Sequence, residues 1–151
     1  MEPRTRARAR LDDRLSSLRP TQRYAVPPRG WLRAIRDALG MSGRQLGKRL
    51  GITPQSVAEL ERSETLGTIQ LKTLRRAAEA LDCTLVYALV PNASLAATVE
   101  ARARKVALRD LARVSHSMAL EDQAVRDSDL EERIRAYIEQ ALRGRDLWDE
   151  P

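Results

Sequence analysis

The sequence of 151 residues is poor in the side chains from which most catalytic and metal sites are built. It contains one cysteine and one histidine. A single cysteine excludes an intramolecular disulfide framework and a cysteine-based zinc site, and it favours a reducing compartment. The chain also lacks a glycine-rich phosphate loop and any set of His, Cys or carboxylate residues at ligand spacing. We therefore expect no enzymatic activity and no cofactor.

Long hydrophobic runs and aromatic residues are also scarce. The longest apolar run covers residues 85–90, whereas a membrane span needs about 20 apolar residues. The arginine-rich N-terminus lacks the hydrophobic segment of a secretory signal. Aromatic residues make up 3% of the chain and phenylalanine is absent, so leucine, alanine and valine must fill the interior. These features predict a mostly α-helical protein in the cytoplasm, associated with the nucleoid and not with a membrane.

The net charge of +6 is unevenly distributed. Residues 1–30 contain eight basic and three acidic residues, residues 31–91 nine and six, and residues 92–151 ten and twelve, which gives net charges of +5, +3 and −2. A basic first half suits a polyanion, and a slightly acidic C-terminal part suits a different partner. We expect three corresponding domains: a basic N-terminal helix with a proline-rich linker, a DNA-binding domain, and a C-terminal helical extension.

The most informative stretch covers residues 41–64 and predicts two short helices joined by a tight turn. Ser42 is placed to cap the first helix, and Gly51 can take the positive φ angle that ends it sharply. Thr53 is placed to cap the second helix, and Pro54 fits its first position because no N–H is needed there. Two helices joined by a short glycine-containing turn form a helix-turn-helix, whose second helix enters the major groove.

The second of these helices has an apolar face and a polar face. Its polar residues are Gln55, Ser56, Glu59 and Arg62. Gln55 can make two hydrogen bonds with adenine, and Glu59 can accept one from cytosine, so we predict that these two residues read bases. An alternative for Glu59 is an ion pair with Arg62 or Arg44. The residues predicted to contact phosphates, which set register without reading sequence, are Arg44, Lys48, Arg49, Ser56 and Arg62.

Residues 31–90 resemble the helix-turn-helix of the Xre and phage Cro-repressor type. The chain is similar over a longer range to the family called mobile mystery protein A, through the segments PPRGWLRAIRDALGM, LKTLRRAAEALDCTLVYALVP and HSMALEDQ. The resemblance implies a lambda-repressor-like core with one β-strand and a C-terminal helical extension. Two positions depart from the wider pattern: Gly43 replaces a glutamine that often supports DNA contact, and Pro54 cannot donate a hydrogen bond.

Three flanking features leave alternatives open. Leucines at helical spacing in residues 4–18 predict a helix that either packs on the body of the protein or lays its arginines on DNA. Arg33 and Arg36, on the polar side of the helix that starts near Trp31, either contact phosphates or face solvent. Residues 83–90, CTLVYALV, predict a strand that must pair with residues 23–26 or with the same strand of a second subunit.

The segment HSMALED, residues 116–122, is either the end of a helix or an inhibitory motif. In the family that the chain resembles, the protein is paired with a Fic-domain protein. Antitoxins of Fic enzymes carry the pattern Ser/Thr-x-x-x-Glu-Gly/Asn, in which the glutamate pairs with an arginine of the Fic site and blocks productive placement of the ATP γ-phosphate. Ser117 and Glu121 fit this pattern, and Asp122 departs from it.

Together these observations predict a sequence-specific DNA-binding regulator. We expect a homodimer that binds double-stranded DNA at a palindromic operator and represses its own operon. The alternative is an antitoxin-like protein that inhibits a Fic-domain partner and binds DNA for autoregulation.

Overall fold

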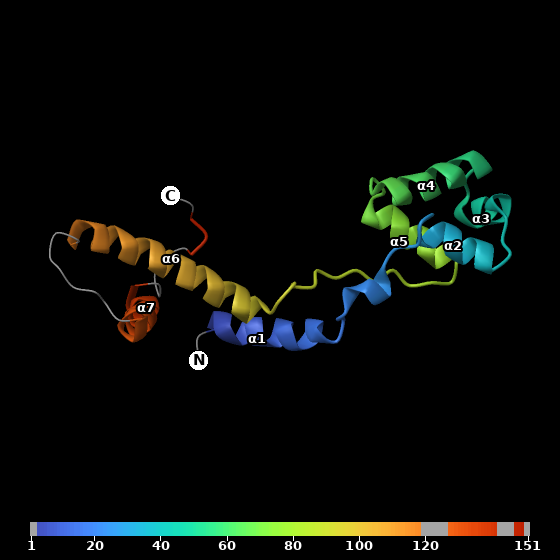
Figure 1. Ribbon diagram of the computed structural model, residues 1–151. Coiled ribbons are helices and arrows are strands. Elements are labelled where there is room, and N and C mark those ends of the chain that lie inside the picture. Colours follow the sequence, from blue (N-terminus) through green and yellow to red (C-terminus); the bar gives the residue numbers. More distant parts are fainter. Residues whose placement is uncertain (1–2, 119–126, 142–146, 150–151) are drawn as a thin grey trace. The chain divides into compact units, whose positions relative to one another are not determined.

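The computed structural model describes residues 3–118, 127–141 and 147–149, and it is mostly helical, as the sequence predicts (Figure 1). The helices are α1 (Pro3–Ser16), the 3-10 helix η1 (Thr21–Tyr24), α2 (Trp31–Ala38), α3 (Gly43–Leu50), α4 (Pro54–Leu66), α5 (Leu71–Ala80), α6 (Leu95–Met118) and α7 (Asp127–Ala141). The chain divides into two compact units. We call them the central unit, Arg19–Leu89, and the terminal unit, Met1–Leu18 with Val90–Pro151.

The core of the central unit is built from aliphatic side chains, as the scarcity of aromatic residues predicts. α3 packs against α4 and α5, and α2 packs against α4. The buried core residues, which come from these four helices and the residue that follows α5, are Leu32, Leu46, Leu50, Val57, Ala77 and Leu81. Half-buried Ile52 and Leu60 pack against them. This core holds α4 with one face inward and the other free.

Local hydrogen bonds form the corner between α3 and α4 at the predicted residues. Ser42 Oγ accepts from the N–H of Gln45 at 3.1 Å, and the Gln45 side chain accepts from the N–H of Ser42 at 2.8 Å. This capping box starts α3, and Gly51 ends it with a φ of 69°. Thr53 Oγ1 then accepts from the N–H of Ser56 at 3.1 Å and starts α4. The predicted caps and the predicted turn are confirmed.

Gly47 determines how closely α3 approaches the turn that follows it. A Cβ added at Gly47 would lie 2.7 Å from the carbonyl oxygen of Ile52. The turn cannot easily retreat, because the N–H of Ile52 donates to the carbonyl of Gly47 at 2.9 Å. Glycine is therefore the residue that fits here without displacing the backbone of the corner.

The strand predicted over residues 83–90 is not formed within the chain. These residues have no regular secondary structure, and the three described ranges contain no strand. A strand needs the backbone groups of a neighbour. The intrachain partner that the sequence suggested, residues 23–26, begins inside η1, so its first two residues are helical and cannot form a ladder.

In the terminal unit, α1 and α7 both pack against α6. The carboxylate of Asp12 on α1 accepts from the N–H of Leu95 at 2.6 Å and from the N–H of Ala96 at 3.1 Å. These are N–H groups that have no partner inside α6, and a negative charge is favoured at this end of a helix. α1 therefore packs on the body of the terminal unit, which is the first of its two predicted alternatives.

The contact between α6 and α7 combines small buried side chains with an exposed ion pair. Ala103 and Val106 on α6 and Ile134 on α7 are buried. Arg104 Nη1 donates to Glu131 at 2.8 Å, and the hydrogen bond from Arg104 lowers the pKa of the Glu131 carboxyl. Among the described helices, none is long and apolar enough to cross a membrane.

Replacing Gly47 with alanine is expected to destabilise the central unit by about 1–3 kcal/mol, because the added Cβ overpacks the turn. The matched control is Gly43→Ala at the first position of α3, where the Cβ meets only Val57 Cγ1, at 3.8 Å, and overpacks nothing. Urea unfolding followed by Trp31 fluorescence, in a Trp148→Phe background, measures this unit alone. Equal stabilities of the two variants would contradict the role of Gly47.

Candidate nucleic-acid interface

The outer face of α4 carries a row of exposed polar side chains. Gln55, Glu59 and Arg62 are exposed, and Ser56 is half-buried. Residues four and three positions apart lie on the same side of a helix, so Gln55, Glu59 and Arg62 share one face. Glu61 is buried on the inner side. The inner and outer faces of α4 are those that the spacing predicts, except at Ser56, which lines a groove and whose hydroxyl accepts from Thr53 Oγ1 at 3.0 Å.

A buried ion pair joins the inner face of α4 to α2. Arg36 Nε donates to Glu61 Oε1 at 2.5 Å, and Arg36 Nη2 donates to Glu61 Oε2 at 3.2 Å. Arg36 Nη1 also donates to the carbonyl of Met41 at 2.8 Å. Arg36 is 8% exposed and Glu61 is 6% exposed. Both alternatives that the sequence suggested for Arg36, a phosphate contact and a solvated side chain, are therefore wrong.

The ionic state of this pair follows from its geometry. The hydrogen bond to Glu61 raises the pKa of Arg36 above its ordinary value, although burial acts in the opposite direction. Arg36 therefore stays charged inside the core. A buried charge needs a partner and satisfied hydrogen bonds. The guanidinium finds them in the Glu61 carboxylate, in Asp37 Oδ1, which lies 3.2 Å from Arg36 Nη1, and in one backbone carbonyl. The pair consequently ties α2, α4 and the entry to α3 together.

A second glutamate of α4 caps α2. Glu64 accepts from the N–H of Trp31 at 2.8 Å and from the N–H of Leu32 at 2.9 Å. The carboxylate satisfies two N–H groups that have no partner inside α2, and it faces the positive end of the helix dipole. Glu61 and Glu64 thus hold α4 against α2 at two points, and they leave the opposite face of α4 free.

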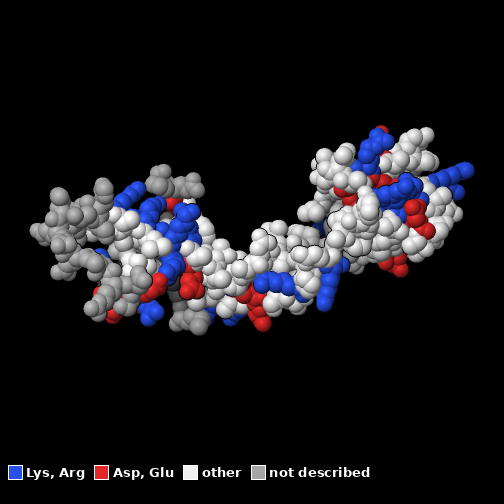
Figure 2. Space-filling view, in the orientation of Figure 1, with Lys and Arg blue, Asp and Glu red and all other residues white. Residues whose placement is uncertain are grey.

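Exposed basic side chains also lie on α3, and Figure 2 shows lysine and arginine side chains on the visible surface of the central unit. Arg44 and Lys48 are exposed four positions apart on α3. Arg49 is exposed too, and its Nη1 donates to the carbonyl of Ala80 at 3.1 Å, near the end of α5. Part of the Arg49 guanidinium is therefore already in use.

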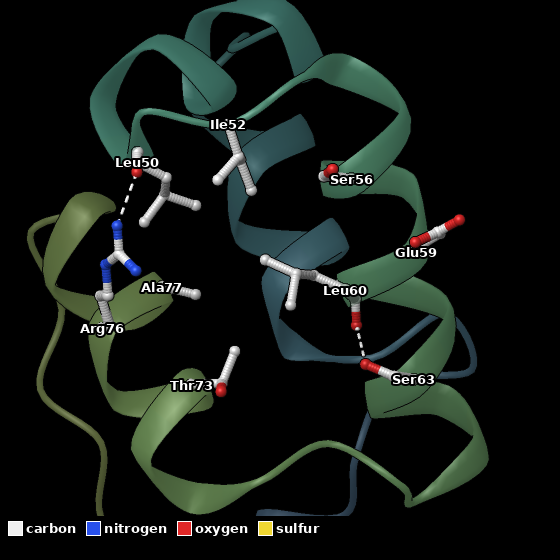
Figure 3. Close-up of a pocket in the computed structure, with 9 residues that line it drawn as sticks. All are labelled: Leu50, Ile52, Ser56, Glu59, Leu60, Ser63, Thr73, Arg76 and Ala77. Carbon is white, nitrogen blue, oxygen red and sulfur yellow. Dashed lines mark hydrogen bonds between the residues drawn. The ribbon is translucent and has the colours of Figure 1, made fainter.

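Glu59 lies beside a groove and is not paired. Neither Arg62 nor Arg44 forms an ion pair with it in the described part of the chain, so the alternative ion pair is not found. A groove of about 390 Å³ lies between α4 and α5. Figure 3 shows Leu60 pointing into this groove and Glu59 projecting away from it. The Glu59 carboxylate is consequently available on the outer surface of α4.

The terminal unit carries further unpaired cations. Arg6, Arg10 and Arg14 are exposed at four-residue intervals on α1, and none of them forms an ion pair within the residues that the structure describes. Packing of α1 on α6 therefore leaves these arginines accessible. The packing of this helix on the body of the terminal unit therefore does not exclude the other alternative, in which its arginines contact DNA.

The inhibitory motif suggested by the sequence cannot be placed. Ser117 belongs to the last turn of α6, and its side chain is outside the described residues, as is all of Glu121. In the described ranges, no group of three or more His, Cys, Asp or Glu side chains is arranged to hold a metal ion.

Comparison with known families agrees with this geometry. Residues 32–87 match the family model described as Helix-turn-helix, which is of the Xre and lambda-repressor type. The central unit therefore contains a helix-turn-helix domain, and the protein is a DNA-binding regulator. Comparison with curated proteins gives no match, and comparison with solved structures gives none either.

Removing one member of the buried pair is expected to lower the free energy of unfolding of the central unit far more than removing both members. Glu61→Met should destabilise the central unit by about 3 kcal/mol, because it removes the buried carboxylate that pairs with Arg36 and leaves that charge in the core with only the half-exposed Asp37 and the Met41 carbonyl. The double variant Arg36→Met with Glu61→Met should recover most of that loss. The exposed Glu59→Met, two positions away, is the control and should change stability by less than about 0.5 kcal/mol. Additive effects of Arg36→Met and Glu61→Met in urea unfolding would show that the pair is not coupled.

Proposed function

We propose that the protein is an autorepressor that reads a palindromic operator as a homodimer. The observation that carries this proposal is the exposed row of Gln55, Glu59 and Arg62 on a helix that is anchored from behind by Glu61 and Glu64. An anchored α-helix with a free polar face fits the major groove of B-DNA, where every base pair presents a distinct set of donors and acceptors.

Two residues of α4 are proposed to read bases. Gln55 lies in the first turn of α4, and the N-terminal residues of a recognition helix are those that reach base edges. Its amide can pair with N6 and N7 of adenine, and the unpaired carboxylate of Glu59, one turn further on, can accept from N4 of cytosine. A carboxylate is repelled by phosphates, so Glu59 contributes to specificity more than to affinity.

Affinity is proposed to come from contacts with the DNA backbone. The proposed phosphate contacts on α3 and α4 are Arg44, Lys48, Arg49, Ser56 and Arg62. The arginines of α1 add further positive charge. Since Gly43 and Pro54 lack two of the usual contacts of this domain type, these cations and a second subunit have to supply most of the binding energy. Binding should therefore weaken steeply as salt is raised.

The homodimer follows from the small size of one reading surface. A single helix with two base-reading residues distinguishes only a few base pairs. Two copies related by a two-fold axis read two half-sites about 34 Å apart, which makes the operator a palindrome. A regulator of this kind commonly acts on its own promoter, so the DNA directly upstream of its gene is the first operator candidate.

Footprinting of the purified protein on that upstream DNA, at two salt concentrations, tests the proposal. We expect a short protected palindrome, and we expect Gln55→Ala to lose about 1–3 kcal/mol of discrimination at the adenine that Gln55 reads. The control is Gln70→Ala, because Gln70 is exposed and its side chain makes no capping hydrogen bond at α5. Protection that is blind to sequence, or equal effects of the two substitutions, would refute base reading by α4.

A second candidate function rests on the segment HSMALED and on the net charge of −2 of residues 92–151. The alternative is that the protein inhibits a Fic-domain partner, with Glu121 paired to an arginine of the partner's active site. A carboxylate and an arginine make a strong charge-assisted pair when water is excluded. DNA binding by the central unit would then regulate the production of both proteins.

This alternative predicts that Glu121→Ala releases the Fic-domain partner from inhibition, because the carboxylate that blocks the ATP γ-phosphate is lost. Asp122→Ala, next to it, should leave inhibition intact, since Asp122 departs from the inhibitory pattern. The measurement is ATP-dependent modification by the partner at increasing ratios of this protein. Full inhibition by the Glu121→Ala variant would remove the hypothesis and leave the autorepressor proposal untouched.

A further inference from the structure

The segment that follows α5 has unpaired backbone groups. The N–H of Cys83 donates to the carbonyl of Ala78 at 2.9 Å. Beyond it, no backbone group of residues 84–90 forms a hydrogen bond with the described part of the chain. Figure 1 shows this stretch as a trace without helix or strand. Seven consecutive residues thus present free donors and acceptors.

Most side chains of the same segment are apolar, and three large ones are exposed, while Leu85 and Val90 are half-buried. Val86 is 79% exposed, Tyr87 65% and Leu89 88%. Residues 84–90 carry no charged side chain, and they are rich in the β-branched and aromatic types that favour strands. An uncharged, exposed segment with free backbone groups is a template for pairing with another strand. Residues 84–90 therefore have the composition of a strand, and only a partner strand is missing.

No partner strand lies in the described ranges of this chain, and a strand from another chain can fill that role. A second copy carries an identical segment, and two uncharged segments do not repel each other. The proposed operator binding already brings two copies together across a two-fold axis. We propose that residues 84–90 of two copies pair as an antiparallel β-ribbon that forms the dimer interface, an inference that rests on the proposed homodimeric function.

The ribbon would place large side chains on one face. In a strand, Leu85, Tyr87 and Leu89 point to the same side, so two copies bring six of them together. A two-stranded ribbon alone is only marginally stable in water. The dimer should therefore be weak in free solution and should strengthen on a palindromic operator, where two neighbouring half-sites raise the effective concentration of one subunit near the other.

A cysteine scan tests the ribbon directly, because Cys83 is the chain's single cysteine. In a Cys83→Ser background, one cysteine is placed at each of positions 84 to 90 in turn, and disulfide-linked dimers are quantified after mild oxidation, with and without operator DNA. The control is Leu66→Cys, which is exposed in the central unit but lies outside the segment (Leu66 is 69% exposed).

The expected profile has one maximum. In an antiparallel pair only the residue at the axis faces its own counterpart at a Cα separation of about 4.5–5.5 Å, within reach of a disulfide. Each step away from the axis adds about 7 Å, twice the rise per residue of a strand. Cross-linking should therefore peak at one position and fall on both sides. A flat profile at the level of the Leu66→Cys control, or equally strong cross-linking at every position, would overturn the antiparallel ribbon.

Proline substitution separates this proposal from the proposed function. Val86→Pro removes a backbone donor and should weaken dimerisation at least tenfold in sedimentation experiments, whereas Val86→Thr, which keeps a β-branched side chain, should change it less than threefold. Both should leave the unfolding of the central unit unchanged, because Val86 lies outside the core. Equal dimerisation and equal operator protection by Val86→Pro would overturn the interface and leave the repressor intact. A ribbon that cross-links as expected in a protein without operator recognition would overturn the repressor proposal alone.

Discussion

The buried ion pair between Arg36 and Glu61 is the contact on which the arrangement of the helix-turn-helix depends. Its guanidinium reaches a carboxylate on α4 and the backbone carbonyl of Met41 before α3, so one side chain connects three helices. Such a pair in a small aliphatic core is directional, which leucine and alanine contacts are not. Hydrophobic packing brings the helices together, and the pair adds a directional contact that joins α4 to α2.

The two faces of α4 have separate tasks as a consequence. Glu61 and Glu64 point inward and hold α2. Gln55 and Glu59 are exposed on the other side. Three acidic residues within six positions would otherwise be a poor composition for a helix that approaches DNA. Two of them face α2, where Glu61 pairs with Arg36 and Glu64 caps the helix, and only Glu59 is exposed to meet the polyanion.

The corner of the helix-turn-helix could be predicted residue by residue, and much of the rest could not. Ser42, Thr53 and Gly51 act on backbone groups at most four positions away, so their effect is visible in a short window of sequence. The strand over residues 83–90 was predicted from composition alone. It is not formed within the chain, because composition states a preference for pairing and cannot supply the neighbouring strand.

The sequence by itself determined the helices, the position of the turn and the polar face of α4, since all of these depend on caps, glycine and side-chain period. Only the tertiary structure decided which charges are buried and which units form. Arg36 meets Glu61 across 25 positions, and Asp12 caps α6 across 83 positions. The neighbouring residues in the sequence do not distinguish a charged side chain that will be buried from one that will stay in water. Its partner is selected when packing removes both from water, and that happens only in the folded chain.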